Sequence, residues 1–200
     1  MKNMPKLFVI SGCNGAGKTT ASYTILPEML NCQEFLNADE IAKGISPFEP
    51  DKVSIQAGKI MLERVQLLLD SGKDFAVETT LATRTYANLI KKAQKYGYKV
   101  TLLYFWLNMP SLAVERVKLR VTSGGHNVTE EKIRRRYDLS IHYLFSIYIE
   151  LCEYWMIIDN SKSPEIICEG GKKITTKIHN KTLFNQLVNY ERIRNTRTEG

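Results

Sequence analysis

The sequence predicts an α/β fold of three layers, in which helices cover both faces of a mainly parallel sheet of five strands. Two observations lead to this prediction. Short apolar runs alternate with segments of helical periodicity along most of the 200 residues, which is the pattern of βαβ units. The first apolar run, residues 7–10, leads directly into a glycine-rich stretch that continues as a helical segment.

That glycine-rich stretch fits the pattern G-x-x-x-x-G-K-[ST] from Gly12 to Thr19, the P-loop motif. Glycines let the backbone approach a phosphate closely, and the N–H groups of the loop and of the helix start bind anions. Lys18 supplies charge for the β- and γ-phosphates, and the Thr19 hydroxyl is a ligand for Mg²⁺. We therefore predict a P-loop NTPase of nucleotide kinase-like fold that uses ATP and Mg²⁺. The nucleotide-binding residues are Gly12, Cys13, Asn14, Gly15, Ala16, Gly17, Lys18, Thr19 and Thr20.

The other elements follow from periodicity and end signals. The fourth strand is almost wholly apolar or aromatic, which suits a central parallel strand covered on both faces. Asp51 is the expected N-cap of a helix with apolar residues at helical spacing, Pro110 opens another, and Thr129 caps a third. Strands are expected at residues 7–10, 34–37, 74–78, 100–107 and 155–159, and the main helices at 51–69, 85–96, 111–121, 129–150 and 182–194.

The C-terminal region differs from the rest. Residues 166–168 and 172–178 suggest a β-hairpin, with Gly170 and Gly171 as its turn. We expect this hairpin and the last helix to form a small appendage, residues 161–200, of a single kinase domain that spans the chain.

Composition narrows the class of protein. No apolar run is long enough to span a bilayer, and the N-terminus leads into the first strand without a secretory signal. Four scattered cysteines and three histidines argue against a zinc site and against a disulfide framework. The expected location is the reducing cytoplasm.

The net charge of +7 has three readings: nucleic acid as a partner, an anionic small substrate together with ATP, or a solvated basic surface. The basic residues are spread along the chain and no basic stretch is interleaved with aromatic residues, as single-strand binding would require. A small anionic acceptor is therefore the preferred partner, and nucleic acid comes third.

Two carboxylates follow strands of the expected sheet, Asp39 after the second and Glu78 at the end of the third. Ligands of open parallel sheets lie at the carboxyl ends of the strands. A kinase needs one carboxylate to take the proton of the acceptor hydroxyl and an acidic group for the water shell of Mg²⁺. The alternative for Asp39 is that it merely caps the following helix.

Arginines supply the positive charge that neutralises a transferring phosphoryl group. Arg120 precedes a glycine-bearing loop, and Arg134, Arg135 and Arg136 lie on the helix after it. Residues 120–136 could form a lid over ATP, although successive helical residues turn by about 100°, so at most two of the three arginines can face inwards. The alternative is a basic solvated face. Cys13 lies near the helix start, where the pKa of its thiol could be lowered. The favoured interpretation is that Cys13 is only a small residue that fits the loop.

With these residues in place, the chain resembles the zeta toxin-type P-loop kinases from about residue 6 to residue 160. Apart from the P-loop, each matching piece is weak alone, and their order and spacing are specific. The pieces are the P-loop and residues 35–42, 75–81, 97–100, 115–120, 124–128 and 133–137.

The resemblance implies roles for particular residues. Asp39 would be the base, and Arg120 with Arg135 or Arg136 would stabilise the transferring phosphoryl group beside Lys18. Asn160 would lie near adenine. The residues that would line the acceptor pocket are Asp39, Glu78, Thr79, Thr80 and Arg84.

The resemblance also implies a substrate and a partner. Known members phosphorylate the sugar of UDP-N-acetylglucosamine and are held in check by an antitoxin, here expected to be a small helical protein. Two further readings stay open: a P-loop kinase with another acceptor, such as a nucleoside, a polynucleotide end or a metabolite, and a nucleotide-gated binding protein without turnover.

Overall fold

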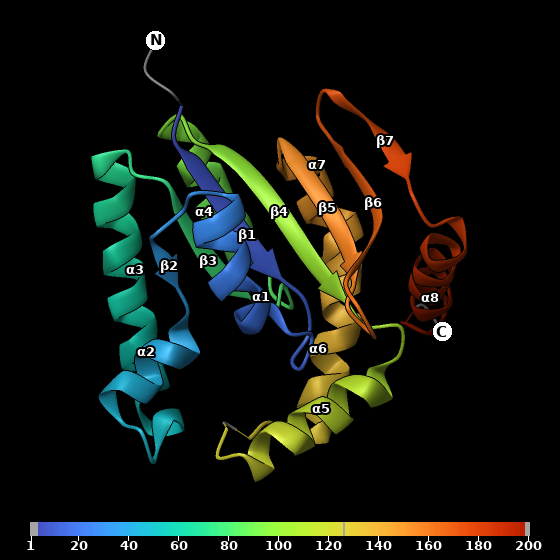
Figure 1. Ribbon diagram of the computed structural model, residues 1–200, viewed down its shortest axis with the longest axis horizontal. Helices are drawn as coiled ribbons and strands as arrows, with labels where there is room; N and C mark the ends of the chain where they lie inside the picture. Colours follow the sequence, from blue (N-terminus) through green and yellow to red (C-terminus); the bar gives the residue numbers. More distant parts are fainter. Residues whose placement is uncertain (1–3, 126, 199–200) are drawn as a thin grey trace.

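The computed structural model describes residues 4–125 and 127–198; His126, in the predicted glycine-bearing loop, lies outside them. The elements alternate as βαβ units up to β5 and end with a hairpin and a helix (Figure 1). In chain order they are β1 (Lys6–Ser11), α1 (Lys18–Thr24), η1 (Ile25–Met29), β2 (Phe35–Leu36), α2 (Ala38–Ile45), η2 (Pro50–Val53), α3 (Ser54–Ser71), β3 (Phe75–Thr79), α4 (Thr85–Lys95), β4 (Lys99–Trp106), α5 (Pro110–Thr122), α6 (Glu130–Tyr143), η3 (Leu144–Tyr148), α7 (Ile149–Leu151), β5 (Tyr154–Asp159), β6 (Glu165–Gly171), β7 (Ile174–Ile178) and α8 (Lys181–Thr198).

The strands form one sheet in the order β2-β3-β1-β4-β5-β6-β7. The first five are parallel, whereas β6 and β7 are antiparallel to their neighbours. The prediction of a mainly parallel α/β sheet is confirmed, but the prediction of five strands is wrong, because the sheet has seven. The hairpin expected to stand apart pairs with the open edge of β5 and extends the sheet.

The two glycines of the hairpin do not form its turn. Gly170 and Gly171 end β6, and the turn is at Lys172 and Lys173. A Cβ on Gly171 would lie 2.1 Å from the Glu153 carbonyl oxygen, and one on Gly170 would lie 2.6 Å from the Trp155 ring. Glycine is needed here because β6 passes close to the start of β5.

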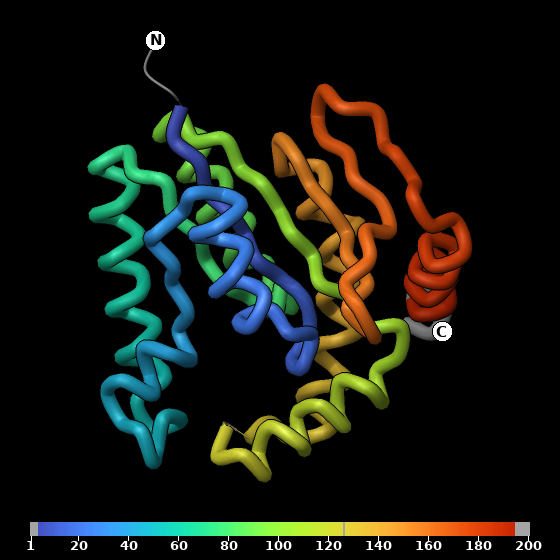
Figure 2. The backbone as a smooth tube through the Cα atoms, in the orientation of Figure 1, coloured from blue at the N-terminus to red at the C-terminus, as the bar shows by residue number. Residues whose placement is uncertain are grey.

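Helices cover both faces of the sheet. α1 lies in front of β1, and α4 and α6 lie behind the sheet, while α5 crosses the lower end where the parallel strands finish (Figures 1 and 2). Two buried hydroxyls fix α6 against β4: Tyr104 shares a hydrogen bond of 2.7 Å with Ser140, and Tyr137 donates to the Leu107 carbonyl oxygen at 2.6 Å. These bonds set the position of α6 relative to the strand ends.

The helix expected from residue 51 needs correction, whereas the long helix expected up to residue 150 does not. The residues around Asp51 form the short 3₁₀ turn η2, and α3 begins at Ser54 with no side-chain cap. Two of its apolar residues at helical spacing are not buried, since Ile55 is 78% exposed and Ile60 is 39% exposed, so the buried stripe is narrower than the spacing suggested. The long helix expected up to residue 150 is present, with the π-helical segment η3 inside it.

All four cysteines are free and buried. Within residues 4–125 and 127–198, no helix combines the length and the apolar character that crossing a bilayer would need.

Replacement of Gly171 by alanine tests the close approach of β6 to β5. Since the added Cβ would collide with the Glu153 carbonyl oxygen, we expect the free energy of unfolding to fall by about 1–3 kcal/mol, measured by urea denaturation. Gly58→Ala is the matched control, because no atom lies within 4 Å of its Cβ position in α3. It should raise stability by about 0.5–1 kcal/mol, and equal effects of the two changes would contradict the steric explanation.

Candidate active site

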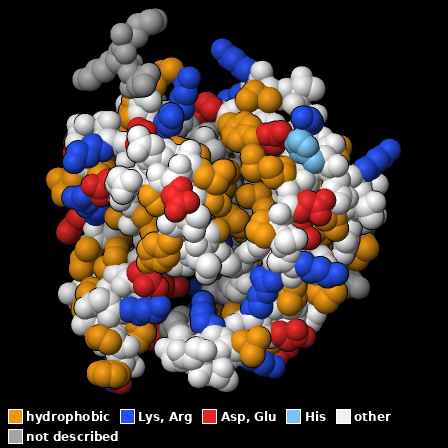
Figure 3. Space-filling model, viewed as in Figure 1, with side chains coloured by type: hydrophobic (Ala, Val, Ile, Leu, Met, Phe, Trp, Pro, Cys, Tyr) orange, Lys and Arg blue, Asp and Glu red, His pale blue; other side chains and the backbone are white. Residues whose placement is uncertain are grey.

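A cavity of about 470 Å³ lies where β1, β2 and β3 end. Figure 3 shows the hollow between the α2 side and the α5 side of this face, with Lys and Arg side chains at its edges. The cavity is lined by Asn14, Gly15, Gly17, Lys18, Thr19, Thr20, Asn37, Ala38, Asp39, Glu40, Lys43, Glu78, Thr79, Thr80, Thr83, Tyr86, Arg116, Arg120 and Arg136.

The P-loop has the backbone that its glycines permit. Gly15 and Gly17 have φ of 79° and 81°, and Gly17 is the N-cap of α1. A Cβ on Gly12 would lie 2.1 Å from the Phe105 carbonyl oxygen, so the loop rests directly on β4. The helix start and its N–H groups therefore point towards the cavity that Lys18 and Thr19 line.

Glu78 contacts both functional residues of the motif. Its Oε2 accepts a hydrogen bond from Thr19 Oγ1 at 2.8 Å, and its Oε1 lies 3.7 Å from Lys18 Nζ. Lys18 also donates to the Cys13 carbonyl oxygen at 3.0 Å. Both Lys18 and Glu78 side chains are largely buried, which strengthens their electrostatic interaction. The carboxylate at the end of β3 is thus joined to the start of α1.

Asn37 is the cap of α2. Its Oδ1 accepts from the backbone N–H groups of Asp39 at 2.9 Å and Glu40 at 3.4 Å. The alternative that Asp39 merely caps this helix is therefore wrong, because Asn37 performs that role. Asp39 lines the same cavity as Lys18.

The predicted arginines separate into two groups. Arg120 and Arg136 line the cavity, and Arg136 Nη1 donates to Asn14 Oδ1 at 3.2 Å. Burial lowers the pKa of the Arg136 guanidinium, and the charge of Asp39 opposes this change. Arg134 pairs with Glu130 at 2.8 Å on the exposed side of α6.

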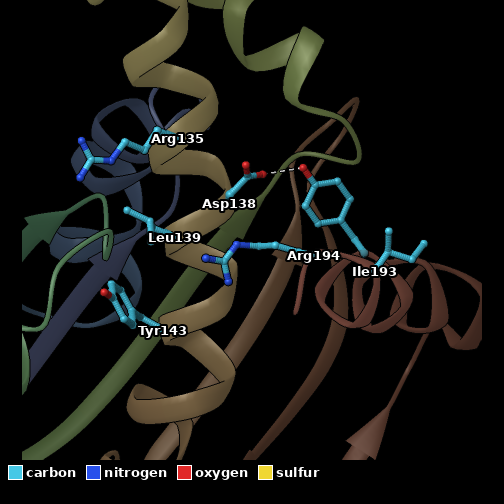
Figure 4. A pocket seen from close by; sticks show the side chains of 7 residues that line it. Arg135, Asp138, Leu139, Tyr143, Ile193 and Arg194 are labelled. Atoms are coloured by element: carbon cyan, nitrogen blue, oxygen red, sulfur yellow. Dashed lines mark hydrogen bonds between the residues drawn. The ribbon is translucent and has the colours of Figure 1, made fainter. Parts of the chain in front are cut away.

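Arg135 does not reach the cavity, contrary to its predicted catalytic role. It lines a separate groove between α6 and α8, together with Leu139, Tyr143 and Arg194 (Figure 4). The reason is the helical turn of about 100° per residue, which directs Arg135 and Arg136 to different sides of α6.

Of the five predicted acceptor residues, only Arg84 does not line the cavity. Its guanidinium lies 5.7 Å from the centre of the Tyr143 ring. Leu81 is fully buried with φ of +58°, a backbone conformation that costs about 1–3 kcal/mol for such a residue. This strained turn brings Thr83 to the cavity in place of Arg84.

Four residues assigned to nucleotide binding do not line the cavity: Gly12, Cys13, Ala16 and Asn160. Asn160 Nδ2 donates to the Ala16 carbonyl oxygen at 2.8 Å, and a Cβ on Gly17 would lie 2.5 Å from that same nitrogen. Cys13 is buried under the loop, and this burial raises its pKa to about 11, although Lys18 and Arg116 lower it. The idea of an acidified thiol is therefore wrong.

Seven lining residues were not predicted as site residues: Asn37, Ala38, Glu40, Lys43, Thr83, Tyr86 and Arg116. Arg116 could have been found, because it precedes Arg120 by four residues and so shares its helix face. Tyr86 donates to the Glu78 carbonyl oxygen at 3.4 Å, a contact that depends on the strained turn and has no signal in the sequence.

Comparison with known proteins gives the family. The model of the family described as Zeta toxin matches residues 1–146. The chain belongs to the zeta toxin family. The resemblance inferred from the sequence is thereby confirmed. A relative described as an uncharacterised protein of Haemophilus influenzae is 30% identical over 132 residues, which cover 66% of this chain and 92% of that protein.

Solved structures similar to this zeta toxin family chain show the fold. One is from the study of the PezAT chromosomal toxin-antitoxin system of Streptococcus pneumoniae, with a TM-score of 0.67, 16% identity and coverage of 98% of this chain and 88% of that one. Another is the AvrRxo1-ORF1:-ORF2 complex with ATP, with a TM-score of 0.71, 14% identity and coverage of 93% and 64%. The family and the kinase-like fold support a P-loop phosphotransferase.

The burial of Cys13 leads to a prediction about thiol reactivity. With a pKa near 11, about one molecule in a thousand would carry the reactive thiolate at pH 8. We expect Cys13 in the folded protein to react with iodoacetamide at least about 100-fold more slowly than in the urea-unfolded protein, followed by peptide mass spectrometry. Because the pKa is raised, reactivity should increase only as the pH approaches 11. Rapid labelling of folded protein at pH 8 would contradict this description of the loop.

Proposed function

We propose that this protein is a Mg²⁺- and ATP-dependent kinase that moves the γ-phosphoryl group to a hydroxyl of a small anionic acceptor, with a UDP-N-acetyl sugar as the first candidate. The observation that carries the proposal is the shared cavity of Lys18 and Asp39. A phosphate-binding lysine and a carboxylate that does not cap its helix face the same space, as transfer to a hydroxyl requires.

Asp39 is the base in this mechanism. Its carboxylate takes the proton of the acceptor hydroxyl while the acceptor oxygen bonds to the γ-phosphorus, and the bond from that phosphorus to the β,γ-bridging oxygen breaks, so that ADP leaves. The proton then resides on the Asp39 carboxylate until solvent removes it. Asn37 fixes the backbone of Asp39 at the start of α2 through its bond to the Asp39 backbone N–H.

Cationic side chains neutralise the charge of the transferring group. Lys18 contacts the β- and γ-phosphates from the P-loop, and Arg120 and Arg136 approach from α5 and α6. A planar guanidinium matches a phosphoryl group with two parallel hydrogen bonds. Arg136 is anchored to Asn14 of the P-loop, so its charge is already directed to the site.

The residues beside the P-loop fit Mg²⁺. The Thr19 hydroxyl and the Glu78 carboxylate are 2.8 Å apart, and oxygen ligands with few protein carboxylates are what Mg²⁺ accepts when phosphates complete its shell. Among the described residues there is no cluster of three His, Cys, Asp or Glu that could hold a metal. Bound Mg²⁺ would neutralise charge on the phosphates. We assign Thr19 as its ligand and Glu78 to its water shell.

The acceptor end of the cavity has hydroxyls and mixed charge. Thr79, Thr80, Thr83 and Tyr86 offer hydrogen bonds to a polyol, and Lys43 supplies a positive charge. These groups support a small acceptor with hydroxyl and anionic parts. A panel of nucleotide sugars, nucleosides, polynucleotide ends and sugar acids, assayed for labelled phosphate, separates the candidates.

A protein partner is part of the proposal. The PezAT structure belongs to a toxin-antitoxin system, and AvrRxo1-ORF1 was solved with AvrRxo1-ORF2. By analogy, we propose that a small helical antitoxin binds this chain. Co-expression with the adjacent reading frame and measurement of growth would test it.

Asp39→Asn tests the base. With Mg-ATP and UDP-N-acetylglucosamine, we expect kcat for ADP formation to fall by about 10²- to 10⁴-fold, with the Kd for an ATP analogue and the melting temperature unchanged. Asn37→Ala is the comparison, since loss of the cap should lower stability by about 1 kcal/mol. Turnover of Asp39→Asn at the original rate would show that another group accepts the proton.

Arg136→Gln and Arg135→Gln form a matched pair on adjacent residues. Because only Arg136 lines the cavity, its loss should lower kcat by about 10²- to 10³-fold, whereas Arg135→Gln should stay within about threefold. Steady-state kinetics with the best acceptor of the panel measures both. Equal losses, or a greater loss at Arg135, would contradict the assignment of the two side chains.

A further inference from the structure

A groove of about 780 Å³ lies between α6 and α8, and it shares no lining residue with the active-site cavity. The family model matches residues 1–146, so α8 (Lys181–Thr198) lies outside that match. The proposed kinase activity gives this groove no role, and a role for the groove does not depend on that activity.

Three contacts hold α8 against α6. The Tyr190 hydroxyl donates to Asp138 Oδ1 at 2.6 Å, and His142 Nδ1 lies 2.9 Å from Glu191 Oε1. The Tyr190 ring meets the Tyr137 ring edge to face, with 5.3 Å between the ring centres. The two walls of the groove are therefore joined directly to each other.

The α6 wall is a stripe of three side chains. Arg135, Leu139 and Tyr143 follow one another at intervals of four residues, so they share one face of the helix (Figure 4). At 1.5 Å per residue the stripe is about 12 Å long, a little over two helical turns. The α8 wall contributes Ile193 and Arg194. Ile193 is 55% exposed although it is apolar.

The form of the groove favours a helix over a small molecule as its occupant. Sites for small molecules are concave and bury most of the ligand surface, whereas none of the described residues that line this groove is buried. Two tyrosines and two arginines are among these lining residues, and neither lysine nor glutamate is. This is the composition of the central part of a protein interface, and an amphipathic helix is the element that fits a partly apolar groove.

The charge of the groove selects the kind of helix. Arg134 and Arg136 are held by neighbouring side chains, whereas Arg135 between them is exposed and forms no ion pair within residues 4–125 and 127–198. At the other end of the stripe, the Arg84 guanidinium lies 5.7 Å from the centre of the Tyr143 ring. Positive charge at both ends of an apolar stripe complements a helix that carries acidic residues beside its apolar face.

We propose that the groove between α6 and α8 is a docking site for an acidic amphipathic helix of a partner protein. Apolar side chains of that helix lie on Leu139 and Tyr143, and its carboxylates pair with Arg135 and Arg84. Arg136 follows Arg135 on α6 and lines the cavity, so the partner binds beside the active site. Because no lining residue is shared, the cavity stays open to nucleotide.

Synthetic peptides test the site on the intact chain without nucleotide. The probe is a fluorescein-labelled helical peptide of about 15 residues, with leucines at i, i+4 and i+7 and glutamates beside them. In a second peptide lysines replace the glutamates. We expect fluorescence anisotropy to show binding of the glutamate peptide, and at least about tenfold weaker binding of the lysine peptide. Arg135→Glu should weaken binding of the glutamate peptide by about 3- to 10-fold, and Leu139→Gln by about 10-fold.

Arg134→Glu is the matched control. It makes the same charge change on the adjacent residue, which pairs with Glu130 on the exposed side of α6, and the Kd of the glutamate peptide should stay within about twofold. A saturating ATP analogue with Mg²⁺ should not displace the peptide. The melting temperature of each variant verifies that it is folded.

Several results would overturn the assignment. Absence of binding, or equal binding of both peptides, would contradict an acidic helix as the occupant. Equal weakening by Arg134→Glu and Arg135→Glu would place the peptide on the general positive charge of the chain, and displacement by the ATP analogue would place it in the cavity. Dimerisation of the free chain that is lost in Leu139→Gln would assign the groove to a second copy. Peptide binding without phosphoryl transfer would contradict the proposed function alone, and transfer without peptide binding would contradict this docking site alone.

Discussion

The contact of one carboxylate with the P-loop organises the site. Glu78, near the end of β3, contacts Lys18 and Thr19 at the start of α1. This carboxylate therefore joins β3 to the helix that follows its neighbour β1. Largely buried charges of this kind are stable only when paired. The pairing joins β3 to the start of α1, and the hydroxyls of Thr79, Thr80, Thr83 and Tyr86 follow it in the sequence along one side of the cavity.

On the β4 and β5 side of the site, packing and close backbone contacts hold α6 and the P-loop in position. Buried tyrosines attach α6 to β4, and Asn160 attaches the end of β5 to the P-loop. Since a Cβ at Gly12 or Gly17 would collide with its neighbours, the loop has one position relative to both strands. Arg136 and Arg116 reach the cavity because their helices are held in this way, and no lid movement is needed to bring Arg136 to Asn14.

The sequence was most informative where a short motif determines local structure. Residues 12–19 specified the loop, the helix start and the strand before it, and the carboxyl-end rule for parallel sheets placed Asp39 and Glu78 at the cavity. It was least informative where the answer depends on tertiary contacts. Arg135 and Arg136 could not be separated without the rotation of α6, and the exchange of Arg84 for Thr83 depends on the left-handed Leu81. The hairpin was recognised, but its pairing with β5 was missed, since nothing local distinguishes a free hairpin from two added strands.

The added strands give the sheet a new boundary. All five residues of β7 are exposed, and its outer edge is a row of backbone groups to which another extended chain could attach. Lys177 lies on this edge strand, and Lys172 and Lys173 form the turn before it. Lys172 is paired with Glu153, whereas lysines such as Lys173 and Lys177 at a sheet edge oppose edge-to-edge association of two copies. Part of the positive charge of the chain thus lies at the edge of the sheet, three strands from β4.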